Sequence, residues 1–303
     1  MSNVLLDTGT GEVEIVEFMV DNQSYGINVL KIKSIIKVDK ITLLPQMREE
    51  ILGLTNVRGS MNTVIDLSMV LHNKKTENYS NSLGLLCELN GKIVVFLVEK
   101  VKGIRRVLWQ DIKQVSDSER NSLSIGSILI DDSIIVLLDF ESITIAAGIG
   151  NGYESQAELS NIDNDTGKKA KVVVVEDSKA IGEMIKCTLL ESGYSNIKLF
   201  SNGVEAKEYI FGIKKKLGIN FNEEIDVIIT DIEMPIMDGY TLTKSIKEDD
   251  ILKKIPVIIF SSLITDELKH KGEAVGADIQ IGKPSMKELV DVINKLFNES
   301  RKN

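Results

Sequence analysis

The sequence predicts a multidomain chain with two fold classes: an all-β domain over residues 12–147 and a doubly wound α/β domain over residues 171–300. The chain has 303 residues, which is enough for about two domains. Its halves differ in hydrophobic pattern, since the first reads as short strands and the second as apolar strands alternating with amphipathic helices. Between them, residues 148–170 are rich in Gly, Ser, Asn and Asp without either period, which predicts a linker.

Strand-like stretches separated by Gly, Asn or Asp turns dominate the first half, which predicts a β-rich domain. The clearest are IVEFMVDNQSYGINV (15–29), GKIVVFLVEKV (91–101) and SILIDDSIIVLLDF (127–140). One helix-like segment, EEILGLTNVRG (49–59), interrupts the strands. Trp109 is expected to pack in this domain, with a binding platform as the alternative.

Two segments of the first half are similar to each other. TVIDLSMVL (63–71) and IVLLDFESI (135–143) each consist of an apolar strand that ends in an acid and leads into a short mixed stretch. The similarity is consistent with two related β subdomains, and chance is the alternative.

In the second half, five apolar strands alternate with helix-like stretches. Continuous Val and Ile runs are typical of strands buried on both faces, and intervening helices imply right-handed crossovers between parallel strands. The pattern predicts a (βα)5 doubly wound domain, in which ligands gather beyond the carboxyl ends of the strands. The predicted strands are KVVVVE (171–176), IKLF (197–200), IDVIIT (225–230), PVIIFS (256–261) and DIQIG (278–282).

Composition and charge argue against nucleic-acid binding, binding to anionic lipid, secretion and membrane insertion. The formal net charge of −9 gives the chain no general attraction to nucleic acid or anionic lipid. Cys87 and Cys187 lie far apart in apolar runs and are expected to be buried free thiols, which fits a reducing cytoplasm. The first residues lack a signal-peptide pattern, and no apolar run reaches the ~18 residues of a membrane span. We therefore expect a cytoplasmic protein without direct membrane insertion.

Polar side chains end or follow four strands of the second half. Glu176 and Asp177 follow the first strand, Asp231 follows the third, Ser261 ends the fourth and Lys283 follows the fifth. Because the carboxyl ends of parallel strands meet at one edge of a sheet, we expect these side chains to lie together. For any one acid, a helix cap or a solvated loop residue is the alternative, whereas the whole set favours a site.

Three neighbouring carboxylates repel one another, and the repulsion raises the pKa of at least one of them. A hard divalent cation removes this penalty, and a ligand set of oxygens without His or Cys suits Mg²⁺. With a cation on one side and Lys283 opposite, Asp231 is suited to act as a carboxylate nucleophile toward a phosphoryl group. Ser261 would then donate a hydrogen bond to the transferred group.

Four segments of this half resemble the signature segments of response-regulator receiver domains, namely VVVVEDS, TDIEMPIMDGY, VIIFSS and GADIQIGKP. The resemblance covers roughly residues 169–300, with the motifs in order. It implies a flavodoxin-like sheet with strand order 2-1-3-4-5 and makes Asp231 the phosphoacceptor. It also implies that Ser261 and Lys283 are the family's hydroxyl and lysine, and that Pro284 is its cis-proline candidate.

The same resemblance implies a set of Mg²⁺ ligands. Asp177 would bind the ion directly and Glu176 largely through water, with Asp231 beside them and the backbone carbonyl of Glu233 as a further ligand. Gly239 would supply flexibility where the next helix begins.

Two residues near the predicted site are distinctive. Receivers usually carry Tyr or Phe three residues before the lysine, where this chain has Gln280. The ring of the usual aromatic switch is therefore missing, and movement of Ser261 and its loop is the alternative route for a signal. Glu233 places an acid near the phosphoryl group, and we hypothesise that it alters the dephosphorylation rate. An unchanged acyl-phosphate lifetime in Glu233→Asn would remove this hypothesis.

In the first half, LTNVRG (54–59) places an Asn, an Arg and a Gly after an apolar stretch. The chemistry of Arg58 is consistent both with a solvated loop residue and with an anchor for a protein contact through its planar guanidinium.

YGINVLKIKSII, ILGLTNVRG and TVIDL resemble CheW-type coupling domains over about residues 12–147. The resemblance implies a double barrel, in which each barrel has five strands. It also implies that Gly53 and Arg58 belong to the chemoreceptor-facing region. Asn56, in the same Asn-Val-Arg-Gly core, is a further candidate for partner binding.

Two other residues match family positions that lie toward a CheA-type histidine kinase, Ile32 and Ser34. The family often has Glu where this chain has Ser34, which leaves the strength of the kinase contact open. It often has Pro where this chain has Thr63, which changes only a strand edge.

A coupling domain followed by a receiver is the arrangement of CheV-type chemotaxis adaptors. We therefore expect a non-enzymatic scaffold that couples the cytoplasmic tips of chemoreceptors to a CheA-type histidine kinase at membrane receptor arrays. Mg²⁺-dependent phosphorylation of Asp231 would regulate it. A phosphate sink that uses the receiver alone is the alternative. A phosphatase of the dehalogenase type matches poorly, because Ile232 and Glu233 follow Asp231 where such enzymes carry a second aspartate two residues on.

Overall fold

The computed structural model describes residues 12–77, 79, 82–89, 91–108, 111–114, 123–149, 170–234, 236–262 and 266–300. The chain divides into two compact units, of which the first is Glu12–Gly150 and the second contains Asn151–Asn303. Trp109 and most of the predicted linker lie outside the described residues, so the packing of Trp109 and the linker boundaries stay predictions.

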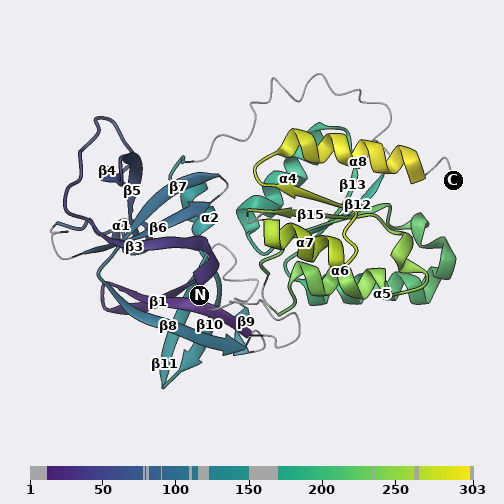
Figure 1. The fold of residues 1–303 in the computed structure, drawn as a ribbon, viewed down its shortest axis with the longest axis horizontal. Helices are drawn as coiled ribbons and strands as arrows, with labels where there is room; N and C mark the ends of the chain where they lie inside the picture. The colour runs from purple at the N-terminus through teal and green to yellow at the C-terminus, as the bar shows by residue number, and fades with distance from the viewer. Residues whose placement is uncertain are drawn as a thin grey trace. The chain divides into compact units, whose positions relative to one another are not determined.

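The first unit is built from strands and two short helices (Figure 1). Its strands are β1 (Glu12–Val20), β2 (Gln23–Asn28), β3 (Ile32–Lys37), β4 (Ile51–Val57), β5 (Ser60–Asp66), β6 (Leu83–Leu89), β7 (Lys92–Val98), β8 (Lys100–Leu108), β9 (Lys113–Gln114), β10 (Ser124–Ile130) and β11 (Ser133–Leu138). Helix α1 (Leu67–His72) follows β5, and α2 (Phe140–Ala146) follows β11. The strands form two sheets, in the orders β8-β1-β2-β11-β10-β9 and β3-β6-β7-β5-β4. The predicted β class with two subdomains is confirmed, and the two-residue β9 adds a sixth strand to the first sheet.

Apart from β9, the two sheets share one strand order. The order β8-β1-β2-β11-β10 matches β3-β6-β7-β5-β4 if the chain consists of two repeats, β1 to α1 and β6 to α2. Each repeat then places its first hairpin in one sheet and its later strands in the other. Each sheet also contains one equivalent parallel pair, β11 with β2 and β5 with β7. The similar segments 63–71 and 135–143 therefore occupy equivalent positions at the ends of the repeats.

The predicted helix at 49–59 is wrong, because β4 occupies this segment and pairs with β5. The pairing shifts register next to Gly53, whose φ is 142°. A Cβ at Gly53 would lie 2.2 Å from the carbonyl oxygen of Thr42, so a larger residue does not fit. Leu52 and Gly53 are both buried although they are neighbours, which breaks the alternation that identifies a strand in sequence.

The two sheets of the first unit share one hydrophobic core. Phe140, at the start of α2, lies 4.4 Å from Phe96 of β7 and 6.0 Å from Phe18 of β1 between ring centroids. All three rings are buried and meet edge to face. Because β1 and β7 belong to different sheets, α2 joins the two halves of the core.

The second unit contains one parallel sheet between two layers of helices (Figure 1). Its strands are β12 (Lys171–Val175), β13 (Asn196–Phe200), β14 (Val227–Thr230), β15 (Val257–Ser261) and β16 (Ile279–Gly282). Its helices are α4 (Lys179–Glu191), α5 (Gly203–Leu217), α6 (Gly239–Lys247), α7 (Asp266–Ala274) and α8 (Met286–Ser300). The order β13-β12-β14-β15-β16 confirms the predicted order 2-1-3-4-5. Helices α4 and α8 cover one face of the sheet, and α5, α6 and α7 cover the other.

The two cysteines differ in exposure. Cys87 in β6 is buried, as predicted, but Cys187 in α4 is exposed, so its predicted burial is wrong. In α4 the buried residues Ile181, Ile185 and Leu189 recur every four residues, and Cys187 lies off this stripe. Among the described residues, no helix combines the length and apolar character that a bilayer span requires.

Candidate functional site

Glu176, Asp177 and Asp231 lie together at the carboxyl edge of the parallel sheet. The backbone N–H of Asp231 donates to the carbonyl of Val175, the last residue of β12, at 2.9 Å. One carboxylate oxygen from each of the three acids lies within 4.8 Å of the others. Glu176 and Asp231 are buried and Asp177 is half-buried. These side chains therefore converge at the edge where the strand pattern places them.

Lys283 supplies the positive charge at this edge. It follows β16 and is 5% exposed, and its Nζ lies 2.8 Å from Glu176 Oε2 and 3.2 Å from Asp231 Oδ2. The peptide bond between Lys283 and Pro284 is cis, as expected. One ammonium thus pairs with two of the three carboxylates, so it carries one positive charge against their two negative charges.

A divalent cation fits the remaining charge and the donor set. The cluster of Glu176, Asp177 and Asp231 offers carboxylate oxygens, which Mg²⁺ prefers in proteins. Half-burial of Asp177 leaves room for the waters that Mg²⁺ usually retains. Glu233 is buried two residues after Asp231, and the ligand role of its backbone carbonyl stays a prediction.

Backbone contacts fix the orientation of Asp231. Its Oδ1 accepts from the N–H of Ile232 at 2.7 Å, and its carbonyl accepts from the Thr230 hydroxyl at 2.9 Å. Gly239, the first residue of α6, packs against the same carbonyl, and a Cβ there would lie 1.9 Å from the oxygen. Gly239 is therefore required because two backbone segments approach closely, and the flexibility expected of it stays a prediction.

Gly203, the first residue of α5, is a second glycine that packs against the acceptor loop. A Cβ at Gly203 would lie 2.6 Å from the carbonyl oxygen of Met237. Asn202 caps α5 by accepting from the N–H of Glu205 at 2.9 Å. The Asn-Gly pair was the available sequence signal, although it identifies a helix start and not the contact with Met237.

Ser261 ends β15, the strand next to β14, and is buried. Its carbonyl accepts from the backbone N–H of Lys283 at 3.0 Å, which joins the two strand ends. The hydroxyl and the ammonium therefore come from adjacent strands. The contact of Ser261 with a phosphoryl group stays a prediction.

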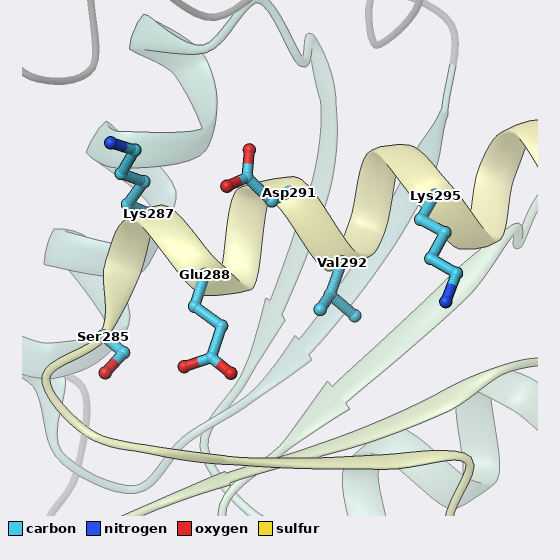
Figure 2. Close-up of a pocket in the computed structure, with 6 residues that line it drawn as sticks. All are labelled: Ser285, Lys287, Glu288, Asp291, Val292 and Lys295. Atoms are coloured by element: carbon cyan, nitrogen blue, oxygen red, sulfur yellow. The ribbon is translucent and has the colours of Figure 1, made fainter.

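A separate pocket of about 400 Å³ lies along the outer side of α8 (Figure 2). None of the acidic-cluster residues lines it. Figure 2 shows Lys287 and Asp291 pointing to one side of the helix and Glu288 to the other. The lining residues are Ser285, Lys287, Glu288, Asp291, Val292 and Lys295. The candidate site is therefore the acidic edge of the sheet and not this pocket.

The predicted receptor-facing residues lie in and near the β4–β5 turn. Arg58 and Gly59 form the turn, with a φ of 50° at Arg58, and the Arg58 side chain is exposed. The Oδ1 atom of Asn56 accepts from the N–H of Gly59 at 2.8 Å, so this side chain shapes the turn. Gly53 is buried in the β4 bulge. Asn56 and Arg58 are thus both exposed at this turn and Gly53 is buried, and partner binding by these three residues stays a prediction.

The predicted kinase-side residues lie on β3, an edge strand of the second sheet. Ile32 packs against the main core and Ser34 is half-buried. The exposed apolar side chain of this strand is Ile35, which is 45% exposed and which sequence reasoning missed. Burial alternates along β3 without a break at its register shift, so Ile35 lies on the exposed face with Lys33 and Lys37.

Comparisons with known proteins cover both units. Residues 14–147 match the CheW-like domain family, and residues 172–294 match the response regulator receiver domain family. The chemotaxis protein CheV3 of Helicobacter pylori is 27% identical over 97% of this chain and 97% of its own length. The chain has the CheV-type arrangement of a CheW-like domain followed by a receiver domain. CheV2 of the same organism is 23% identical over 92% of this CheV-type chain and 91% of its own length.

Among solved structures, the receiver domain of Francisella response regulator 1452 is 32% identical to this chain. The match covers 43% of this chain and 98% of that domain, with a TM-score of 0.37. The CheV-type combination of a CheW-like domain and a receiver supports a chemotaxis coupling adaptor and fits a non-enzymatic signalling protein. Receiver domains generally use Mg²⁺, and the acidic cluster of this chain fits that ion.

Proposed function

We propose that this CheV-type chain couples chemoreceptors to a CheA-type histidine kinase and that phosphorylation of Asp231 regulates the coupling. The observation that carries the proposal is the buried Asp231 carboxylate, which lies beside Glu176 and Asp177 and is paired with Lys283. The names of its relatives, chemotaxis proteins CheV3 and CheV2, support a function in chemotaxis. The proposed location is the cytoplasm, at the receptor tips.

In the proposed reaction, a carboxylate oxygen of Asp231 forms a bond to phosphorus as the bond from phosphorus to a kinase histidine nitrogen breaks. Lys283 already lies beside Asp231 and balances part of the charge of the acyl phosphate. The Ser261 hydroxyl donates a hydrogen bond to the transferred group. Asp177, Asp231 and the backbone carbonyl of Glu233 would hold Mg²⁺, with Glu176 acting through water, and the ion would supply further charge neutralisation when bound.

The energies involved suffice for a partial switch. A charge-assisted hydrogen bond contributes about 1.5–3 kcal/mol, and about 5.5 kcal/mol converts a 1:99 population into 99:1. Only interactions that differ between the two states shift the population. Lys283 is paired with Glu176 and Asp231 before phosphorylation, so only the change in its pairing counts. Ser261 and Lys283 together therefore support a partial shift.

Phosphotransfer combined with kinase activity in receptor membranes tests the proposal. The wild type is compared with Asp231→Asn and with Asp226→Asn as a matched control. Asp226 precedes β14 at the opposite end of the strand, where its carboxylate accepts from the N–H of Lys171 at 2.8 Å. We expect the wild type and Asp226→Asn to take the phosphoryl group and change kinase activity, and Asp231→Asn to do neither. Equal labelling of Asp231→Asn would refute the proposal.

The phosphate sink is the competing function, and Arg58→Ala separates it from an adaptor. A sink requires only the receiver, so this change in the first unit would leave control of the kinase intact. An adaptor that uses Arg58 as an anchor would lose that control while still accepting the phosphoryl group.

A further inference from the structure

Helix α7 has little apolar surface with which to attach to the receiver. Its sequence, DELKHKGEA, is mostly charged. Leu268 and, beyond the helix, Val275 and Ala277 pack against a small cluster that contains Tyr240 and Ile259. Polar contacts therefore carry a large share of its attachment.

Two side chains from different elements donate to consecutive carbonyls of α7. The Tyr240 hydroxyl of α6 donates to the carbonyl of Leu268 at 2.9 Å. The Gln280 amide of β16 donates to the carbonyl of Lys269 at 2.8 Å. A carbonyl oxygen has two lone pairs, so it can accept such a bond besides its bond within the helix. Burial, followed by the charges of Asp238 and Asp231, raises the pKa of Tyr240, which keeps its hydroxyl a donor at neutral pH.

Gly272 makes the Gln280 contact possible. An ideal Cβ at Gly272 would lie 2.3 Å from Gln280 Oε1 and 2.6 Å from Gln280 Nε2. Gly272 is buried under this amide. The absence of a side chain at position 272 and the amide at position 280 are thus two parts of one contact.

Both donors belong to elements that contact Asp231. Helix α6 begins at Gly239, which packs against the carbonyl of Asp231. Strand β16 leads to Lys283, whose ammonium pairs with the Asp231 carboxylate. A change of charge at Asp231 therefore acts on the elements that carry both donors. A hydrogen bond weakens within a few tenths of an ångström or a modest change of angle, so small shifts are enough to loosen it.

We propose that Tyr240 and Gln280 form a clamp that holds α7 on the receiver and loosens when Asp231 carries a phosphoryl group. The coupling to Asp231 rests on the proposed function, whereas the clamp in the unphosphorylated protein does not. The clamp gives this chain a switching contact that needs no aromatic ring at position 280.

Hydrogen exchange of the full chain tests the clamp before any phosphorylation. In Tyr240→Phe and in Gln280→Ala, amides of residues 268–274 should exchange about threefold to tenfold faster, the equilibrium equivalent of one lost hydrogen bond. Tyr194→Phe is the matched control, because it removes the hydrogen bond from a buried tyrosine to Asn294 Oδ1 (2.6 Å), which joins the loop between α4 and β13 to α8. It should leave α7 exchange at the wild-type rate. Wild-type exchange of α7 in both clamp variants would overturn the clamp.

Gly272→Ala supplies a second test that does not depend on truncating a donor. Alanine forms helix more readily than glycine, and this difference in propensity by itself should slow exchange in α7 by about fivefold. We expect this full slowing only in the Gln280→Ala background, where no amide is displaced. With Gln280 present, displacement of its amide should cancel most or all of the gain. Equal slowing in the two backgrounds would show that Gln280 and Gly272 do not act together.

Beryllium trifluoride with Mg²⁺, as a phosphoryl analogue, tests the coupling to Asp231. In the wild type, loading should speed exchange of residues 268–274, and in the Tyr240→Phe, Gln280→Ala double variant it should add little. If the analogue fails to protect the loop after Asp231, the proposed function fails and the unloaded variants still decide the clamp. If the loop is protected while wild-type α7 exchange stays constant, the coupling is wrong.

Discussion

An acid at the end of an apolar strand has two different functions in this chain. Asp66 and Asp139 of the first unit each cap the helix that begins at the next residue. In the receiver, Ser178 and Asp238 cap α4 and α6, so Asp231 does not cap a helix. The pattern in sequence is the same in both cases. What distinguishes them is where the helix begins, and that boundary is uncertain by one or two residues in a sequence.

The pairing of Lys283 leads to a prediction for Lys283→Met. The change removes the ammonium and leaves Glu176 and Asp231 buried without it. Loss of one partner from a buried ion pair costs about 3–5 kcal/mol. Without Mg²⁺, we expect the receiver's free energy of unfolding to fall by about 3 kcal/mol. Part of this loss should be recovered when Mg²⁺ is added. Urea denaturation monitored by circular dichroism measures both values. Lys244→Met, on the exposed side of α6, is the control and should change little. Unchanged stability in Lys283→Met would contradict the inference that Lys283 stabilises the buried carboxylates.

Burial and the neighbouring charge of Glu141 raise the pKa of Asp139. A raised folded-state pKa contributes stability below the unfolded value of about 3.9, and that contribution is lost as pH rises through the folded pKa. Asp139→Asn keeps an acceptor for the N–H of Ser142 and removes the titration. We expect stability of the first unit to decline less above pH ~4 in Asp139→Asn than in the wild type. The single tryptophan, Trp109, reports on this unit in urea titrations followed by fluorescence. Parallel pH profiles for the two proteins would rule out this effect.

At the scale of elements, the receiver was predictable because each strand is a continuous apolar run bounded by helix signals. The buried strand Val227–Thr230 shows this directly. The segment around Gly53 was not predictable, because its bulge depends on the carbonyl of Thr42. The exposure of Ile35 was missed because β3 carries isoleucines on both faces, so the pairing of the strand decides which face is exposed. These features depend on contacts between segments that are distant in sequence, so a local sequence pattern does not predict them.

Two glycine substitutions test how the acceptor loop is held. Gly239→Ala introduces a Cβ at 1.9 Å from the Asp231 carbonyl oxygen. Since backbone must move, we expect a loss of about 3 kcal/mol in the free energy of unfolding, at the upper end of overpacking. Gly212→Ala in α5 is the matched control, because no atom lies within 4 Å of its Cβ. Alanine should stabilise that helix by up to about 1 kcal/mol. Effects of the same sign in urea denaturation of both variants would contradict the packing.

At the scale of the whole molecule, one chain contains two units of different fold class. The CheW-like unit exchanges strands between two repeats, so each sheet depends on both halves of its sequence. The receiver has one sheet with its acidic cluster at the carboxyl edge. The proposed receptor coupling and the proposed phosphorylation therefore involve two different compact units, and a variant in one unit should leave the fold of the other intact.

This separation predicts the behaviour of Arg58→Ala. Arg58 is exposed at a turn that Asn56 shapes, so its truncation should leave the first unit folded. If Arg58 is a hot-spot residue, its truncation costs about 2 kcal/mol or more of binding free energy. Binding to receptor–kinase arrays, followed by co-sedimentation, should therefore weaken by at least about thirtyfold. Arg106→Ala is the control, because Arg106 is an exposed arginine that pairs with Glu14 on β1. Equal loss in both variants would point to general charge attraction instead of a specific contact.

Intact-mass spectrometry of the full chain after incubation with phosphorylated kinase tests the central claim most directly. The samples are wild type and Asp231→Asn, each with Mg²⁺ and with a chelator. We predict that the wild type gains one phosphoryl group only when Mg²⁺ is present and that Asp231→Asn gains none. Transfer to Asp231→Asn, or equal transfer to the wild type after Mg²⁺ is chelated, would contradict the account.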